Sequence, residues 1–243
     1  MFFSGLTEDL VLLAAAAAAT EVLASAALRP ESQLLGGTLI AGTDPMEVAL
    51  TYDDGPNDVS TPPLLDLLAR HNVRATFFMI GKHVRQRPDL VRQVHAGGHL
   101  VGNHTMTHPW LTWQTDNVIR EEISGCSKLL EDTIGAPVRY FRPPHGARRP
   151  FVMRFAAQLG MKTVQWNAMG HDWDPIGVDR IVKEIQKGMR RARKRGRGTN
   201  ILLHDGSDRA LGVNRSDSIW TTARLIDHFA RDGYRTVTVD AWG

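Results

Sequence analysis

The chain has 243 residues, of which 42% are apolar, so it is long enough to bury a full hydrophobic core and short enough to form a single domain. Its one cysteine, Cys126, excludes an internal disulfide framework and any metal site built from several thiolates. A metal site in this chain would need histidine and carboxylate ligands, and the mild net charge of +3 does not by itself indicate a nucleic-acid partner.

Residues 1–44 are predicted to form an alanine-rich helical segment ahead of the main domain, which we place at residues 45–243. The apolar run Leu10–Ala19 has the length of a signal-peptide core, and the small residues at 24–26 resemble a cleavage site. The residues just before the run are acidic, which is the wrong sign for an exported leader. An uncleaved helix packed on the domain fits the same residues, so cleavage and cellular location stay open. No stable membrane span is expected, because alanine is weakly apolar and Glu21 interrupts the stretch.

From residue 47 onward, short runs rich in β-branched and aromatic residues alternate with longer helical patterns, as in chains built from parallel βα units. About seven strands are expected, at Val48–Tyr52, Ala75–Ile80, His99–Asn103, Val138–Arg142, Lys162–Trp166, Asn200–His204 and Arg235–Val239. Helices are expected between them, at Pro62–His71, Asp89–Ala96, Asn117–Ile134, Pro150–Leu159, Val178–Arg193 and Thr221–Asp232. A parallel sheet covered by helices can be an open doubly wound sheet or a barrel, and periodicity does not separate the two.

Basic residues gather at 190–197, at the end of the helix expected over Val178–Arg193. Cations suit the negative end of a helix dipole, and Gly196 and Gly198 suit a helix end. No aromatic residues interleave with the basic ones, as a surface that stacks nucleic-acid bases would require. We therefore interpret the run as a solvated helix end and expect no nucleic-acid partner.

Unusual polar residues fall at the carboxyl ends of the expected strands. They are Asp53 and Asp54 after the first strand, His104 and His108 after the third, Arg142 at the end of the fourth, Asp172 after the fifth and His204 at the end of the sixth. Barrels and open parallel sheets both place their active sites at this face. Five segments that are distant in sequence are therefore expected to converge on one surface.

Asp53 and Asp54 are neighbours, and neighbouring side chains on an extended strand point to opposite sides. They can share a site only where the strand ends and turns, and Gly55-Pro56 supplies such a turn. One carboxylate could then bind a metal while the other takes a proton. An ordinary turn that caps the strand is the alternative interpretation.

His104 and His108 are four residues apart, so they can present two imidazoles from one helix face or from a tight loop. Together with one carboxylate they would leave coordination positions open, as a catalytic metal site needs. His95 and His99 have the same spacing, but Gly97-Gly98 separates them and should end the helix, so we interpret that pair as structural.

Three further motifs complete the set. Arg142-Pro143-Pro144-His145-Gly146 is a stiff loop that could hold a guanidinium beside a carboxylate and aim a backbone N–H at a developing oxyanion, although a rigid crossover explains it equally well. A histidine kept protonated by a carboxylate makes a general acid, and His204 with Asp172 fits that pattern. Trp173 and Leu202 could line a small apolar pocket.

The order of these motifs, Thr-Tyr-Asp-Asp-Gly-Pro, His-Thr-Met-Thr-His, Arg-Pro-Pro-His-Gly, Asp-Trp and Leu-Leu-His-Asp, resembles the NodB-homology polysaccharide deacetylases of carbohydrate esterase family 4. The resemblance runs from about residue 45 to residue 240. It implies a distorted (β/α) barrel, similar to a TIM barrel, with about seven parallel strands.

The resemblance also implies a role for each residue. A divalent metal, usually Zn²⁺, would be bound by Asp54, His104 and His108. Asp53 would be the catalytic base, held by Arg142, and His204 the catalytic acid, tuned by Asp172. Trp173 and Leu202 would shape the acetyl pocket, and the backbone N–H of His145 would meet the oxyanion, although this position is often tyrosine in the family.

The expected reaction is hydrolysis of an N-acetyl group on an N-acetylglucosamine polymer, either peptidoglycan or a chitin-like oligomer, with release of acetate. Two alternatives stay open. One is a hydrolase of the same fold that acts on a non-sugar amide or a cyclic imide. The other is a carbohydrate-binding or nucleic-acid-binding protein without turnover. The sequence does not give the oligomeric state.

Overall fold

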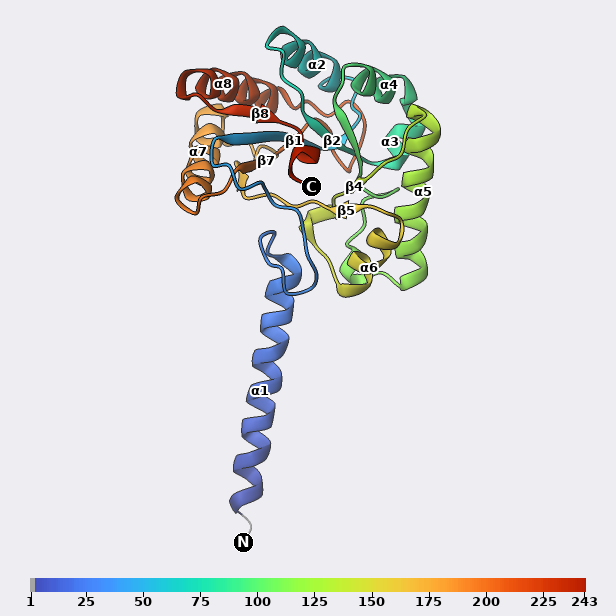
Figure 1. The fold of residues 1–243 in the computed structure, drawn as a ribbon. Helices are drawn as coiled ribbons and strands as arrows, with labels where there is room; N and C mark the ends of the chain where they lie inside the picture. The colour runs from blue at the N-terminus through green and yellow to red at the C-terminus, as the bar shows by residue number, and fades with distance from the viewer. Residues whose placement is uncertain (1–2) are drawn as a thin grey trace.

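The centre of the fold is a parallel sheet whose strands are largely buried (Figure 1). The computed structural model describes the backbone of residues 3–243 and the side chains of residues 12–18 and 20–243, so Met1 and Phe2 of the predicted N-terminal segment lie outside the described residues. In this part of the chain the sheet has eight strands: β1 (Glu47–Gly55), β2 (Thr76–Met79), β3 (Leu100–Asn103), β4 (Tyr140–Phe141), β5 (Lys162–Thr163), β6 (Ala168–Met169), β7 (Thr199–His204) and β8 (Arg235–Val237).

The strand order shows that the sheet is a curled half-barrel. Seven strands follow the order β5-β4-β3-β2-β1-β7-β6, and β8 pairs with the beginning of β1. β5 and β6 lie at the two ends of this order, so the strands themselves do not close the barrel. The structure thus has the expected α/β class and the distorted (β/α) barrel of about seven parallel strands, and it selects the barrel over an open doubly wound sheet.

Helices surround the sheet on its outer side (Figure 1). Their bounds are α2 (Thr61–Arg70), α3 (Gly81–Gln86), α4 (Pro88–Ala96), α5 (Asp116–Ile134), α6 (Pro150–Gln158), α7 (Val178–Lys194) and α8 (Ser216–Asp232). The sequence signals for helix ends agree with the structure at several places. For example, Thr115 accepts a hydrogen bond from the backbone of Val118 at the start of α5, and Gly135 ends the same helix in the left-handed conformation with φ 68°.

Two elements were not expected from the sequence. β6 lies in a stretch that we predicted to be a loop, and its two residues pair with β7 through Ala168 opposite Ile201 and Met169 opposite Leu202. α3 has six residues and follows β2 after a single residue, Ile80. Both are too short for hydrophobic periodicity to reveal.

The N-terminal helix α1 (Phe3–Leu28) projects away from the barrel and meets it only near its C-terminal end (Figure 1). The side chains of residues 12–18 and 20–24 are exposed, whereas Ala26 is buried. The interpretation of this segment as a helix packed on the domain is therefore wrong for most of its described length. Among the residues described in full, the structure contains no helix that is both long and apolar enough to cross a membrane.

The register of the sheet places the strand ends side by side. Asp53 on β1 lies opposite His204 on β7. Asn103, the last residue of β3, lies opposite Phe141 on β4, so His104 and Arg142 leave neighbouring strands at the same level. Parallel pairing in this register brings the predicted functional residues to one edge of the half-barrel.

Candidate active site

A bulge in β1 allows two neighbouring aspartates to serve the same site. The pairing of β1 with β2 shifts between Asp53 and Gly55, and Asp54 adopts the left-handed conformation with φ 71°. A bulge changes the side-chain alternation of a strand, so Asp54 need not point away from the face that Asp53 serves. The sequence predicted that the strand would end before this pair. Instead, β1 continues through both residues.

Asp53 forms a buried ion pair with Arg142. The Arg142 Nη1 donates to Asp53 Oδ1 at 2.7 Å and to Thr51 Oγ1 at 2.9 Å. The guanidinium of Arg142 also lies over the ring of Phe78, with 4.2 Å between Cζ and the ring centroid. Burial lowers the pKa of Arg142, and Asp53 partly offsets that effect. The fully buried guanidinium therefore fixes the direction of the Asp53 carboxylate.

His104 and His108 lie in a loop after β3, not on a helix. Thr105 and His108 both have left-handed backbones, with φ 67° and 66°. The loop is fastened to α5 by Glu122, which accepts hydrogen bonds from the backbone N–H of Thr107 at 2.8 Å and from its hydroxyl at 2.6 Å. Asn103 accepts a further bond from the backbone of Thr105 at 2.7 Å.

Glu122 and Asn103 therefore position the histidine loop, and neither was recognised from the sequence. A helical glutamate and an asparagine at the end of a strand carry no signal of this role, because their partners become visible only in three dimensions.

Asp54, His104 and His108 form a cluster that can hold a metal ion, with one ligand atom from each residue within 4.8 Å of the others. The His108 Nε2 lies 3.2 Å from Asp54 Oδ1, and the His104 Nε2 lies 3.5 Å from the same oxygen. The His104 Nδ1 lies 2.7 Å from the carbonyl oxygen of Arg142 and donates to it, which leaves Nε2 free as a ligand.

The protonation states of this cluster suit a cation. Burial raises the pKa of Asp54, but contact with His104 and the potential of His108 and His204 outweigh burial and hold that pKa well below its usual range. Burial and the neighbouring His104 lower the pKa of His108 to about 3, so its imidazole is neutral near pH 7, as a metal ligand must be. Asp54 Oδ1 is buried without a hydrogen-bond partner among the described residues, as expected of an oxygen that faces an ion.

His204 is held by the carboxylate of Asp172. The His204 Nδ1 lies 2.9 Å from Asp172 Oδ1, and the backbone N–H of His204 donates to Asp172 Oδ2 at 2.7 Å. Ser218 on α8 donates to the same Oδ2 at 2.5 Å. Burial alone would lower the pKa of His204, but Asp172 raises it to about 9. His204 is therefore a protonated imidazole with its Nε2 free.

His145 lies on the rim of the same cleft. Its backbone is left-handed, with φ 58°, in a short 3₁₀ turn at Pro144–Gly146. Its ring stacks on Trp110 with 3.9 Å between centroids, and its other edge faces His108 at 4.6 Å. Two prolines precede His145 in this turn, and the contact with Trp110 places its ring.

A cleft of about 870 Å³ joins these groups. Eight of the ten predicted site residues line it, namely Asp53, Asp54, His104, His108, His145, Trp173, Leu202 and His204. Arg142 and Asp172 lie behind that surface and act on it through Asp53 and His204. Trp173 is 41% exposed and its ring meets that of His204 edge to face at 5.0 Å, whereas Leu202 is buried.

Several residues beside the site had no role predicted from the sequence. Asp205 is buried next to His204, where burial and the nearby Asp54 raise its pKa to about 7, although Thr61 donates to it at 2.5 Å. Gly206 packs so tightly that a Cβ there would overlap the backbone of Asp54. Leu28 and Pro30, which come from the N-terminal segment, also line the cleft.

His99, which we interpreted as structural, lies away from this cleft. It is 6% exposed, and its Nδ1 accepts the backbone N–H of Ala75 at 3.2 Å. Burial lowers its pKa to about 4, so it stays neutral within the fold.

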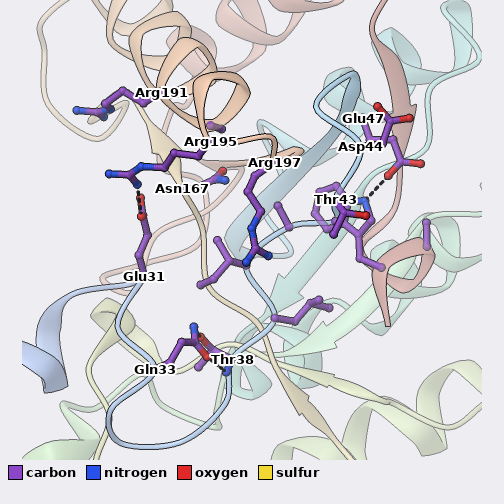
Figure 2. A pocket seen from close by; sticks show the side chains of 17 residues that line it. Glu31, Gln33, Thr38, Thr43, Asp44, Glu47, Asn167, Arg191, Arg195 and Arg197 are labelled. Carbon is purple, nitrogen blue, oxygen red and sulfur yellow. Dashed lines mark hydrogen bonds and ion pairs between the residues drawn. The ribbon is translucent and has the colours of Figure 1, made fainter.

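The basic run at 190–197 coincides with the end of α7, where the sequence placed it. Arg191, Arg195 and Arg197 border a second cavity of about 850 Å³, which lies near the beginnings of β1 and β7 and shares no lining residue with the cleft (Figure 2). Arg195 forms an exposed ion pair with Glu31, with 2.7 Å between Nη1 and Oε2 (Figure 2). The basic run therefore lies apart from the candidate catalytic groups.

Comparison with known proteins identifies relatives along most of the chain. A family model described as polysaccharide deacetylase matches residues 41–164. A peptidoglycan-N-acetylglucosamine deacetylase of Bacillus cereus is 37% identical over 194 residues, which cover 79% of this chain and 85% of the relative. A chitooligosaccharide deacetylase of Sinorhizobium fredii is 40% identical over 167 residues, covering 68% of this chain and 75% of the relative.

The fold also matches a solved structure. That of the peptidoglycan N-acetylglucosamine deacetylase Bc1960 superposes with a TM-score of 0.75 at 29% identity, and the match covers 84% of this chain and 91% of the other.

Proposed function

The chain belongs to the polysaccharide deacetylase family and is a hydrolase of C–N bonds, and we propose that it removes acetyl groups from N-acetylglucosamine units of peptidoglycan or of chitin-like oligosaccharides. The observation that carries the proposal is the meeting of three groups in one cleft. These are the Asp-His-His cluster, the Asp53 carboxylate held by Arg142, and the His204 imidazole held by Asp172. Together they supply an electrophilic site, a base and an acid.

We infer that Asp54, His104 and His108 hold a zinc ion, because two imidazoles and one carboxylate are typical of catalytic zinc sites. The buried and unpartnered Oδ1 of Asp54 and the neutral imidazole of His108 support this assignment. A divalent ion held by these three residues would supply Lewis-acid chemistry toward an acyl carbonyl and a water molecule. All other steps fall to side chains and backbone groups of the protein.

Asp53 is proposed as the base that takes the proton of the attacking water. Its Oδ1 is occupied by Arg142, and its Oδ2 lies 3.7 Å from the His104 Nε2, on the side of the metal cluster. A carboxylate with one oxygen fixed and the other facing the reacting water is oriented for general-base catalysis.

His204 is proposed as the acid that protonates the departing amine. Its pKa of about 9 keeps it protonated at neutral pH, and its Nδ1 is engaged by Asp172. The proton for the substrate therefore resides on Nε2. Water attacks the carbonyl carbon while its proton passes to Asp53, and the C–N bond breaks as His204 protonates the sugar nitrogen. The products are acetate and a free amino sugar.

The remaining predicted residues are proposed to shape the acetyl site. The backbone N–H of His145 would donate to the oxyanion, and the fixed loop supports this role by removing the cost of ordering the donor. Leu202 and Trp173 would surround the acetyl methyl group. Their positions beside His204 in the cleft support the assignment.

Release of acetate tests the proposal directly. The metal-loaded protein should release acetate from peptidoglycan, from chitin oligomers or from both, and a chelator should abolish the release. Asp53→Asn should lower kcat by about 10² to 10⁴-fold, which is the usual contribution of a general base. Asp66→Asn, at an exposed aspartate on α2, is the matched control and should retain full activity.

Two results would count against the proposal. If the metal-loaded protein releases no acetate from either glycan, deacetylation of these substrates is wrong. If Asp53→Asn retains full activity, the assignment of the base is wrong even when the reaction is right. The two substrate arms also separate peptidoglycan from chitin oligomers.

A further inference from the structure

One wall of the cleft comes from a part of the chain that the family match does not reach. Leu28, at the end of α1, and Pro30 line the same cleft as Asp53, whereas the match begins at residue 41. Leu28 is 52% exposed, so a large apolar side chain stands open at the rim of a polar site. Because Leu28 lines the cleft, this exposed apolar side chain is available to a ligand bound there.

A buried arginine fastens this wall to the body. Arg148 is fully buried, and its Nη2 donates to the carbonyl oxygens of Arg29 at 2.9 Å and Ser32 at 2.6 Å. Its Nη1 donates to the carbonyl of Gly146 at 3.0 Å, and its backbone N–H donates to the carbonyl of Ala27 at 3.1 Å. All the hydrogen-bond acceptors found for this guanidinium among the described residues are backbone carbonyl oxygens, and burial lowers its pKa.

The geometry of Arg148 therefore joins two pieces of the cleft. One piece is segment 27–32, which carries Leu28 and Pro30. The other is the turn after His145, because the carbonyl oxygen of Gly146 accepts a hydrogen bond from Arg148. Displacing either piece would strand a buried charge without acceptors, which is costly, so the wall and the turn are held in one arrangement.

The second attachment of the segment is weaker. Glu31 pairs with Arg195 on the surface beside α7 (Figure 2), and the Arg195 side chain is 64% exposed. Exposed ion pairs contribute little, so Arg148 is the main anchor of the wall.

We propose that segment 27–32 contacts the sugar units flanking the one that loses its acetyl group, with Leu28 and Pro30 against the apolar face of a ring. Arg148 is the positioning residue that holds this wall. The inference rests on the proposed glycan deacetylation. The cleft volume of about 870 Å³ supports it, because that is near the upper end for a ligand site and leaves room beyond one acetyl group.

The test compares di- and penta-N-acetylchitooligosaccharides as substrates for the full-length, metal-loaded protein. Leu28→Ser should raise KM for the pentamer roughly three- to tenfold, as loss of part of an apolar contact does, and should change KM for the dimer much less. Leu34→Ser is the matched control. Leu34 is 61% exposed on the same connecting segment but borders a different hollow, so both KM values should stay unchanged.

Arg148→Lys and the double variant with Leu28→Ser separate positioning from general stability. A lysine ammonium cannot reproduce the fork that reaches both Gly146 and segment 27–32. The single variant should therefore raise the pentamer KM as Leu28→Ser does, and the double variant should raise it little further, because both changes act on the same wall. A role in stability alone would lower the melting temperature and leave the KM ratio of pentamer to dimer at its wild-type value.

Three outcomes would overturn the inference. If Leu28→Ser leaves the KM for the pentamer unchanged, segment 27–32 does not contact the flanking sugar units. This conclusion holds even if Arg148→Lys does not fold. Equal KM changes for dimer and pentamer place Leu28 at the reacting sugar instead. If the wild-type protein releases no acetate from either oligomer or from peptidoglycan, both the proposed function and the proposed contact with flanking sugars are wrong.

Discussion

Asp53 and Arg142 hold each other in place at the level of single residues, and this affects how a substitution must be interpreted. Removing one partner of a buried ion pair costs about 3–5 kcal/mol of folding free energy. The pair here has an N···O distance of 2.7 Å, and the Arg142 side chain is fully buried. Activity of Asp53→Asn therefore has to be measured at a temperature where its melting curve shows the folded protein.

The pair of His204 and Asp172 predicts a pH dependence. His204 has its pKa raised to about 9, so it is protonated below that pH and loses its proton as the pH rises through it. Activity that needs this proton should fall on the alkaline side. Asp172→Asn removes the main cause of the raised pKa, so the alkaline limb of kcat/KM should move to lower pH.

The measurement is a pH–rate profile of wild type and Asp172→Asn between pH 5 and 10, roughly the range in which histidine acids titrate. Ser218→Ala is a useful comparison, because Ser218 donates a hydrogen bond to the same carboxylate but is uncharged. The alkaline limb of kcat/KM should shift less in this variant than in Asp172→Asn. An alkaline limb that stays at the same pH in Asp172→Asn would contradict the assignment of His204 as the acid.

The residues proposed to react stand out in the sequence, whereas several residues that contact them do not. Asp53, Asp54 and the two histidines stand out because ionisable groups are unusual at the ends of buried parallel strands. Glu122 reaches the histidine loop from α5, a relation that depends on packing and leaves no local pattern. Arg148 likewise resembles any surface arginine until its carbonyl partners are known.

At the scale of elements, the loops around the site carry unusual backbone conformations. Four residues have φ between 58° and 71°, namely Asp54, Thr105, His108 and His145. Residues other than glycine adopt this backbone conformation at a cost of about 1–3 kcal/mol each. Such conformations persist only where the surroundings determine them. The Asn103 and Glu122 contacts supply that support for the histidine loop.

The close approach of two loops predicts the effect of Gly206→Ala. A Cβ at Gly206 would overlap the backbone of Asp54, so the bulge that presents Asp54 has to move. Metal affinity should fall by about 10 to 100-fold, as it does when groups that support a ligand are altered. Gly37→Ala is the control, since a Cβ there meets nothing within 4 Å.

Titration with zinc against a competing chelator measures this affinity. Equal affinity in Gly206→Ala and Gly37→Ala would show that Asp54 is not positioned by the approach of the β7–α8 loop.

Helices of two or more turns were predictable, whereas α3 and β6 were not. The helix over Asp116–Ile134 was expected within one residue, because its apolar spacing, its cap and its final glycine agree. β6 has two residues, and its formation depends on pairing with β7 rather than on its own sequence. The loop with Asp172 therefore follows a strand that the sequence did not indicate.

At the scale of the whole molecule, the candidate metal ligands come from two distant strands, so ion binding and folding are linked. Asp54 lies near the end of β1 and the histidines follow β3, and these strands adopt their places only in the folded chain. An ion that binds only the folded state, at a concentration 100 times its Kd, adds about 2.7 kcal/mol to the free energy of unfolding. For a chain of this size that amounts to roughly 5–10 °C in melting temperature.

Thermal unfolding with zinc and with a chelator measures this linkage. Zinc should raise the melting temperature of the wild type, and the chelator should return it to the metal-free value. Asp54→Asn should respond weakly to either addition. A melting temperature that is the same with zinc and with chelator would contradict the assignment of the three ligands.

The half-barrel has a gap between β5 and β6, and the N-terminal segment enters this gap. Leu39 fills part of this gap, since its N–H donates to Thr163 at 2.8 Å and its carbonyl accepts from Gln165 at 2.9 Å. Gly42 then accepts from Gly198 at 3.0 Å, next to β7. A chain that begins at residue 45, the predicted domain boundary, would thus leave the outer edge of β5 without its partner. Open strand edges recruit other chains, so such a shortened protein should self-associate more strongly than the 243-residue chain.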